Sequence, residues 1–183
     1  YAACLIRELV RLGEELKAPQ HLNVAFDPPF STVQTGVMSG GKALNIVPQQ
    51  CCFDFEVRSL PTQDPWQVAH QLRLYAEQTL LPAMQAVSAQ CAIGFSELSS
   101  YPGLATSSQS QAAEWVAQFC GSQDFGTVAF GSEGGLFDQA GIPTVVCGPG
   151  SMEQGHKADE FISLQQLDAC DRMLERVVEF VRQ

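Results

Sequence analysis

A strict alternation of apolar and charged side chains over residues 51–58 constrains the fold more than any other feature of the sequence. The odd-numbered positions hold Cys51, Phe53, Phe55 and Val57, and the even-numbered positions hold Cys52, Asp54, Glu56 and Arg58. Successive side chains of a strand point to opposite faces, so this period of two predicts a β-strand with one apolar and one charged face. The extended segment 32–38 and the turn residues of 39–48 predict a hairpin with it.

The elements around this hairpin predict the first domain, over residues 1–98. A first helix carries an apolar stripe of Leu5, Leu9, Leu12 and Leu16. A second helix is expected to take Asp64 as its N-cap and Pro65 as its first residue, and to end or kink at Pro82. With a further strand at 88–98, the order is helix, strand, strand, helix, strand. This order predicts a ferredoxin-like α+β sandwich that lacks its first strand.

The composition turns to Ser, Gly and Pro near Tyr101, where we place a domain boundary. The second domain, residues 101–183, is expected to be part of an α/β domain in which helices and strands alternate. The expected elements are a helix at 107–120, strands at 127–130 and 143–148 with a short helix between them, and a last helix from Leu164. A capping box of Ser163 and Gln166 is expected to start that last helix, and its apolar stripe is expected to pack on the sheet.

Charge and cysteine content exclude several classes of function. Acidic residues outnumber basic ones by 20 to 10, which gives a formal net charge of -10. A basic face that neutralises phosphates is not expected, so we predict no nucleic-acid partner. No apolar stretch approaches the about 20 residues of a membrane helix, so we predict no membrane segment. Seven cysteines without CxxC spacing predict buried thiols and a reducing, cytoplasmic compartment.

Two glycine-rich segments of the second domain are candidates for chemistry because ligands bind at the carboxyl ends of strands in α/β sheets. The loop after 143–148 holds Gly148 and His156, and an imidazole there is a candidate metal ligand or proton carrier. Its alternative is a solvated loop histidine. Glu133, in GSEGGLF (131–137), is a candidate to line the same crevice, with helix capping as its alternative.

The third candidate lies on the hairpin of the first domain. Asn45 and Arg58 stand thirteen residues apart there, and an arginine fork beside an amide would hold a carboxylate or carbonyl oxygen. The alternative is an exposed ion pair between Arg58 and Glu56 or Asp54.

Two long segments resemble one enzyme family. GGKALNIVPQQCCFDFEVR (40–58) and FGSEGGLFDQAGIPTVVCGPGSMEQGHKADEF (130–161) are similar to the acetylornithine deacetylase branch of the aminoacylase and succinyl-diaminopimelate desuccinylase superfamily of metal-dependent amidohydrolases. The resemblance extends over essentially the whole chain. It implies a ferredoxin-like lid, through which the family commonly dimerises, followed by the C-terminal part of a zinc-hydrolase α/β catalytic domain.

The resemblance also implies roles for single residues. His156 corresponds to the last metal-ligand histidine, and Asn45 and Arg58 to lid residues that grip the substrate. Gly148, at the carboxyl end of its strand, is a candidate substrate-binding residue by its position. For Glu133 we infer from its charge that it meets a cationic substrate side chain. The cofactor implied is zinc, with cobalt as an alternative, at two ions per complete site, and the partners are an N-acyl amino acid and a second copy of the chain.

Other residues of the family pattern have no counterpart in this sequence. They are the H-x-D segment, the bridging aspartate, the paired glutamates and the lid histidine, and we expect them upstream of Tyr1, in a longer protein of which this chain is a fragment. The expected reaction is hydrolysis of N2-acetyl-L-ornithine to L-ornithine and acetate. The alternatives are a related deacylase, desuccinylase or carboxypeptidase, and, for the chain in isolation, a non-catalytic dimerisation module.

Overall fold

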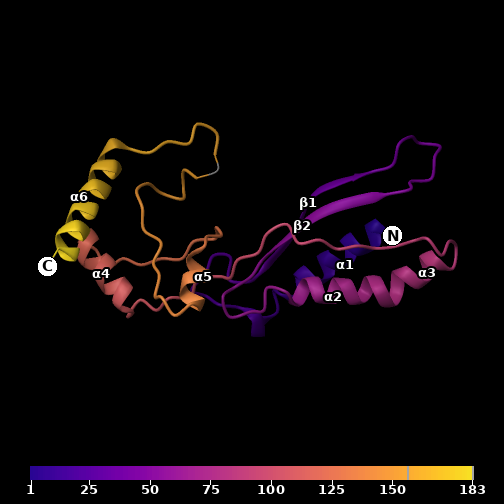
Figure 1. Cartoon of the computed structure of the whole chain (residues 1–183), viewed down its shortest axis with the longest axis horizontal. Helices are drawn as coiled ribbons and strands as arrows, with labels where there is room; N and C mark the ends of the chain where they lie inside the picture. Colours follow the sequence, from indigo (N-terminus) through magenta and orange to yellow (C-terminus); the bar gives the residue numbers. More distant parts are fainter. Residues whose placement is uncertain (156, 183) are drawn as a thin grey trace. The chain divides into compact units, whose positions relative to one another are not determined.

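The computed structural model describes residues 1–155 and 157–182, and the chain divides into two compact units, Tyr1–Ser100 and Tyr101–Gln183 (Figure 1). The elements of the first unit are α1 (Ala2–Glu15), the 3-10 turn η1 (Pro19–His21), β1 (Thr32–Gly40), β2 (Cys51–Arg58), α2 (Gln67–Tyr75), the π-helical turn η2 (Ala76–Leu80) and α3 (Leu81–Gln85). Those of the second unit are α4 (Gln111–Cys120), α5 (Gly134–Gln139) and α6 (Leu164–Val181).

The predicted hairpin is confirmed. Strands β1 and β2 pair antiparallel from Thr32 opposite Arg58 to Gly40 opposite Cys51, with one register irregularity between Thr35 and Val37. In β2 the side chains of Phe53, Phe55 and Val57 are half-buried and pack toward the helices, while those between them are exposed. The alternation in the sequence therefore sets which face of the sheet meets the core.

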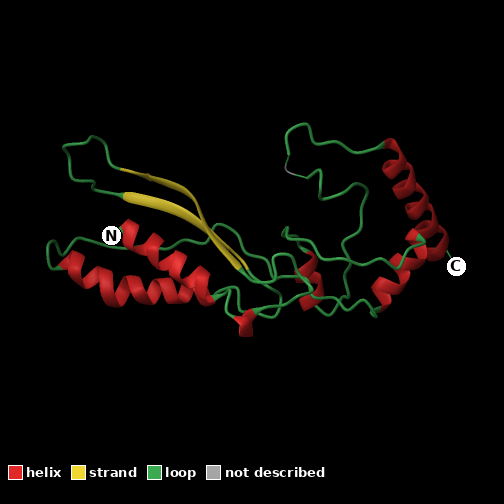
Figure 2. Ribbon diagram, turned by 180° about the vertical axis from the view of Figure 1, so that it is seen from behind, coloured by secondary structure: helices red, strands yellow, loops and turns green. Residues whose placement is uncertain are grey.

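Two helices cover that face, as both views of the fold show (Figure 2). Helix α1 buries its predicted leucine stripe, and α2 supplies the opposing side. The buried set shared by these elements is Leu5, Leu9, Leu12, Leu16, Val68, Leu72, Ala76 and Leu80. Gly13 brings α1 close to β1, because a Cβ at this position would already touch Val33. Helical and strand periodicity thus converge on one core.

The second helix differs in detail from the prediction. It begins at Gln67, and Asp64 accepts a hydrogen bond from the Trp66 backbone in the preceding turn instead of capping the helix. Proline has no N–H to donate into a helix, and the helical hydrogen bonds widen into η2 immediately before Pro82. The chain then continues as α3, so the proline interrupts the helix without reversing it.

The strand predicted at 88–98 is absent from the described structure, so the structure contains the helices and the hairpin of the ferredoxin-like sandwich expected for residues 1–98 but not its last strand. The unit has helices and one two-stranded sheet, β1–β2. Residues 91–95 still alternate between half-buried and exposed, and Ile93 and Phe95 pack on the core. A strand exists only by pairing with a neighbouring strand. Side chains on one face of this segment pack on the core, but its backbone does not pair with a described strand.

In the second unit, α4 packs against α6. The ring of Phe180 lies 5.5 Å from that of Trp115 and 5.4 Å from that of Phe119, measured between centroids. Arg176 donates a 2.5 Å hydrogen bond to the carbonyl oxygen of Phe119, close to the end of α4. Ser110 caps α4 and Gly121 ends it in the left-handed conformation, so the helix is shorter than the predicted 107–120.

The strands predicted at 127–130 and 143–148 are also wrong, because both segments are irregular in the described structure. The predicted α/β domain is represented in this unit by its helices alone. Helix α6 begins at Leu164 as predicted, but without a sheet its apolar side chains Leu167, Leu174, Val178 and Val181 stay largely exposed. The periodicity of residues 164–181 correctly predicts helix α6, but the described structure has no sheet for this helix to cover.

The predicted cysteine burial is wrong as well. All seven cysteines are described, and each is a free thiol that is half-buried or exposed.

Among the helices that the structure describes, none combines the length and apolar character that a membrane span needs.

Candidate functional site

The hairpin holds the two residues expected to grip a substrate at its opposite ends. Asn45 lies in the exposed loop 41–50, within a turn closed by a 3.2 Å hydrogen bond from the Ile46 N–H to the Ala43 carbonyl. Arg58 is the last residue of β2, opposite the first residue of β1. Seven steps along a strand cover about 23 Å, so the structure does not bring Asn45 and Arg58 together within one chain.

Arg58 makes a local ion pair. Its Nε lies 3.0 Å from Oε1 of Glu56, and both side chains are more than half exposed. Two residues apart on a strand, they share the charged face predicted from the alternation. Such an exposed pair contributes at most about 1 kcal/mol, so the guanidinium can exchange this partner for a ligand at little cost.

Glu133 lies exposed at the start of α5, where Ser132 Oγ accepts a 3.2 Å hydrogen bond from the Gly134 N–H. The two glycines that follow are buried, and a Cβ on Gly135 would collide with the carbonyl oxygen of Pro102. The glycines of GSEGGLF therefore allow the chain near Pro102 to pack directly on α5. This is a structural reason for the motif, and it leaves the Glu133 carboxylate in solvent.

The loop after 143–148 is open in structure. Gly148 is exposed, with no described atom within 4 Å of a Cβ built on it, so Glu133 does not reach it. His156 lies outside the described residues. The Gln166 side chain accepts a 3.3 Å hydrogen bond from the Gly150 N–H, which ties this loop to α6. Half of the predicted capping box therefore forms: Ser163 accepts from the Gln166 N–H, but the glutamine side chain is directed to Gly150.

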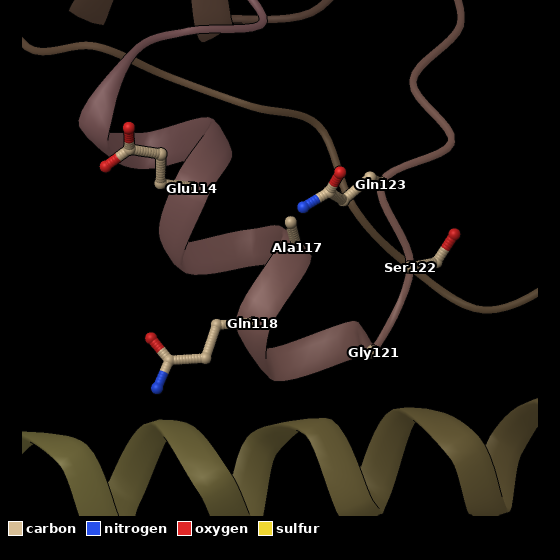
Figure 3. A pocket seen from close by; sticks show the side chains of 6 residues that line it. All are labelled: Glu114, Ala117, Gln118, Gly121, Ser122 and Gln123. Carbon is tan, nitrogen blue, oxygen red and sulfur yellow. The ribbon is translucent and has the colours of Figure 1, made fainter.

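Sequence reasoning missed two features of the second unit. One is a polar groove of about 360 Å³ at the end of α4, lined by Glu114, Ala117, Gln118, Gly121, Ser122 and Gln123. Figure 3 shows that some of these side chains lie on the helix and that those of Ser122 and Gln123 lie on the chain after it. Gln118 is on the side of the neighbouring helix, and the side chains do not converge on a centre. The other feature is a contact between two cysteines, Cys120 and Cys147, which no spacing rule predicts because 27 residues separate them.

Comparison with known proteins finds a family match for part of the chain. Residues 5–84 match the model of the peptidase dimerisation domain family, M20_dimer. The matched residues comprise the α1–α2 core and the β1–β2 hairpin, including Asn45 and Arg58.

Two curated relatives extend the likeness beyond residues 5–84. The acetylornithine deacetylase of Myxococcus xanthus is 33% identical over 159 residues, which cover 87% of this chain and 40% of the relative. That of Pasteurella multocida (strain Pm70) is 30% identical over 174 residues, covering 93% and 42%. The chain thus spans about two fifths of the length of these relatives.

Proposed function

We propose that this chain belongs to a metal-dependent deacylase that hydrolyses N2-acetyl-L-ornithine to L-ornithine and acetate. The observation that carries the proposal is the continuous similarity of both units to acetylornithine deacetylases, over 87% to 93% of the chain. In this reaction the amide C–N bond breaks, the oxygen of water joins the acetyl carbon, and the amine nitrogen takes up a proton.

The described residues do not fit a metal centre by themselves. They contain no group of three or more His, Cys, Asp or Glu side chains that could hold an ion, whereas catalytic zinc takes about three protein ligands. Zinc, or cobalt in its place, remains the proposed cofactor of the complete protein, with His156 as the proposed ligand from this chain.

The metal proposal is tested on the complete protein by replacing His156. His156→Ala is expected to lower the metal content and the rate of acetylornithine hydrolysis together. His70→Ala, at an exposed position on α2, is the matched control and is expected to change neither. Unchanged zinc content by elemental analysis in the His156 variant would return that residue to the class of solvated loop histidines.

The proposed substrate contacts come from both units. Arg58 would form paired hydrogen bonds with the substrate carboxylate, Asn45 would contact the region near the amide, Gly148 would admit the substrate next to the backbone, and Glu133 would meet the ornithine ammonium group. Arg58→Lys is expected to lower kcat/KM about tenfold to a hundredfold, because an ammonium cannot reproduce the planar fork of guanidinium. Wild-type efficiency in this variant would favour the alternative, an exposed ion pair with Glu56.

The activity itself is tested with a panel of substrates on the complete protein. We expect metal-dependent release of acetate from N2-acetyl-L-ornithine to exceed turnover of N-succinyl-diaminopimelate, N-acetylcitrulline and dipeptides. A preference for one of these would reassign the enzyme to the related deacylases, desuccinylases or carboxypeptidases. The 183-residue chain alone is expected to release no acetate.

We propose further that the complete protein is a homodimer joined through residues 1–98, a role that the dimerisation-domain match supports. The hairpin and its connecting loop carry five exposed apolar side chains: Val37, Met38, Leu44, Ile46 and Val47. Exposed apolar surface concentrated in one place is typical of a protein interface. We place the contact between copies on this part of the hairpin.

Sedimentation of the 183-residue chain tests the dimer separately from the activity. Leu44→Ser together with Val47→Ser is expected to shift the chain from dimer to monomer. Val87→Ser removes an equally exposed apolar side chain away from the hairpin and is expected to leave the dimer intact. A dimer without hydrolysis in the complete protein would support the second candidate function, a non-catalytic dimerisation module.

A further inference from the structure

Three cysteines that are distant in the sequence come together in the unit Tyr101–Gln183. Cys120 ends α4, Cys147 lies in the irregular segment 143–148, and Cys170 is on α6. The Sγ atoms of Cys120 and Cys147 are 3.5 Å apart and share a weak hydrogen bond. Cys170 is near enough to act electrostatically on Cys147. Cys120 and Cys147 are both free and exposed, so reagents in solution can reach them.

The two sulfur atoms need to move only a short distance to form a disulfide bond. A disulfide joins its sulfur atoms at about 2.05 Å, so the two Sγ atoms must approach by about 1.5 Å. Cys147 lies in a segment that no strand pairing fixes within the described residues, and Cys120 is the last residue before the glycine that ends α4. Both positions can therefore adjust without breaking a sheet or the middle of a helix.

We propose that Cys120 and Cys147 form an oxidation site, at which a hydroperoxide converts the two thiols into a disulfide that ties the end of α4 to segment 143–148. The overall reaction takes two thiols and one hydrogen peroxide to one disulfide and two waters. Two electrons pass from the sulfur atoms to the peroxide oxygens, whose O–O bond breaks. The structure and the comparisons assign no role to either cysteine otherwise.

The reaction takes place in two steps. Partial burial of the Cys147 thiol, together with the hydrogen bond to Cys120, raises the pKa of Cys147. In the first step the thiolate of one cysteine of the pair attacks a peroxide oxygen to give a sulfenic acid, while the departing hydroxide is protonated to water. The sulfur of the other cysteine then attacks the sulfenic sulfur. The S–O bond breaks, and the hydroxyl leaves with the proton of the second thiol as a second water.

Peptide mapping tests the proposal on the 183-residue chain. The reduced chain is treated with one equivalent of hydrogen peroxide at neutral pH, remaining thiols are alkylated, and cross-linked peptides are quantified by mass spectrometry. We expect the Cys120–Cys147 cross-link to exceed every other pair about tenfold, because the fold holds these thiols in contact. It should disappear on treatment with dithiothreitol.

The chain supplies its own controls. Cys51 and Cys52 are adjacent and exposed, but successive strand side chains point to opposite faces, so they are expected to remain uncrosslinked. Cys120→Ser should remove the cross-link and Cys170→Ser should retain it. Mapping of the wild-type chain in guanidinium needs no variant to fold, and there the preference for Cys120–Cys147 should be lost.

Three results would overturn the oxidation site. The first is an equal yield of the Cys147–Cys170 or Cys51–Cys52 cross-link in the folded wild-type chain. The second is conversion of the thiols to sulfinic or sulfonic acids without any cross-link. The third is a preference for Cys120–Cys147 that persists in guanidinium, since it would then not depend on the fold.

Discussion

The two units of this chain differ in how much of their apolar sequence they bury. Of the buried apolar side chains in the described residues, nine belong to Tyr1–Ser100 and two, Ala113 and Phe119, belong to Tyr101–Gln183. In the first unit, the leucine-rich helices α1 and α2 pack against each other, and strands β1 and β2 pair with each other. In the second, the extended segments lack a described partner strand. Elements that satisfy their backbone locally can form by themselves, whereas strands need a neighbour.

The largest expected difference between the units is in the stability cost of truncating one leucine in each unit. Leu72 on α2 is fully buried, and Leu174 on α6 is 51% exposed. Leu72→Ala should lower the free energy of unfolding by about 2 to 5 kcal/mol, because it removes buried contacts and leaves a cavity. Leu174→Ala should change it by less than about 0.5 kcal/mol. Denaturant titration of both variants measures the difference, and equal costs would mean that the units are packed alike.

A close backbone contact in the second unit lies at the start of α5. Gly135→Ala places a methyl group against the Pro102 carbonyl, and we expect a loss of about 1 to 3 kcal/mol in unfolding free energy. Gly148→Ala is the matched control, since its added methyl meets open space. The thermal midpoint of each variant gives the comparison. Full stability of Gly135→Ala would show that the chain near Pro102 does not pack on this helix.

A smaller effect is expected at the one buried polar residue of the first unit. Ser31, 2% exposed, accepts a 2.8 Å hydrogen bond from the Leu60 N–H and donates to Gln63. Ser31→Ala leaves the Leu60 N–H without this acceptor, and we expect a cost of about 1 to 2 kcal/mol. Ser122→Ala, on the exposed turn after α4, should cost less than about 0.5 kcal/mol. Similar losses at both serines would contradict the burial contrast.

The smallest effect is electrostatic and depends on pH. A hydrogen bond from Arg11 lowers the pKa of the Glu8 carboxyl below its ordinary 4.5. Because the folded pKa is the lower one, the stabilisation is fully present above pH 4.5 and is lost as the pH falls through the lowered value. On this surface helix it is expected to be below about 1 kcal/mol. Glu8→Gln should therefore be less stable than wild type at neutral pH and equal to it in acid, and a constant difference would argue against the ion pair.

What the sequence predicted follows the same division between local and distant pairing. The leucine stripe of α1, the alternation of β2 and the start of α6 at Leu164 were predicted correctly, because each depends on neighbours within a few residues or across one turn. The strands at 88–98, 127–130 and 143–148 were not, because apolar content does not reveal whether a partner strand is present.

The candidate site shows the same limit. Sequence placed Arg58 on the charged face of its strand and paired it with Glu56 as one alternative, and the structure contains that pair. It could not show that the hairpin separates Arg58 from Asn45. Nor could it place Cys120 beside Cys147, because that contact is made between a helix end and a segment 27 residues away.

Amide hydrogen exchange, resolved by residue in the native 183-residue chain, tests the contrast between the units most directly. The account predicts that the amides of α1, α2 and the paired positions of β1 and β2 exchange slowly and together, because they share one core. It predicts that the amides of the irregular segment 145–148 exchange far faster than those of this core. Equal protection of 145–148 and of α1 would contradict the account, because it would show that this segment is held by hydrogen bonds as firmly as the core.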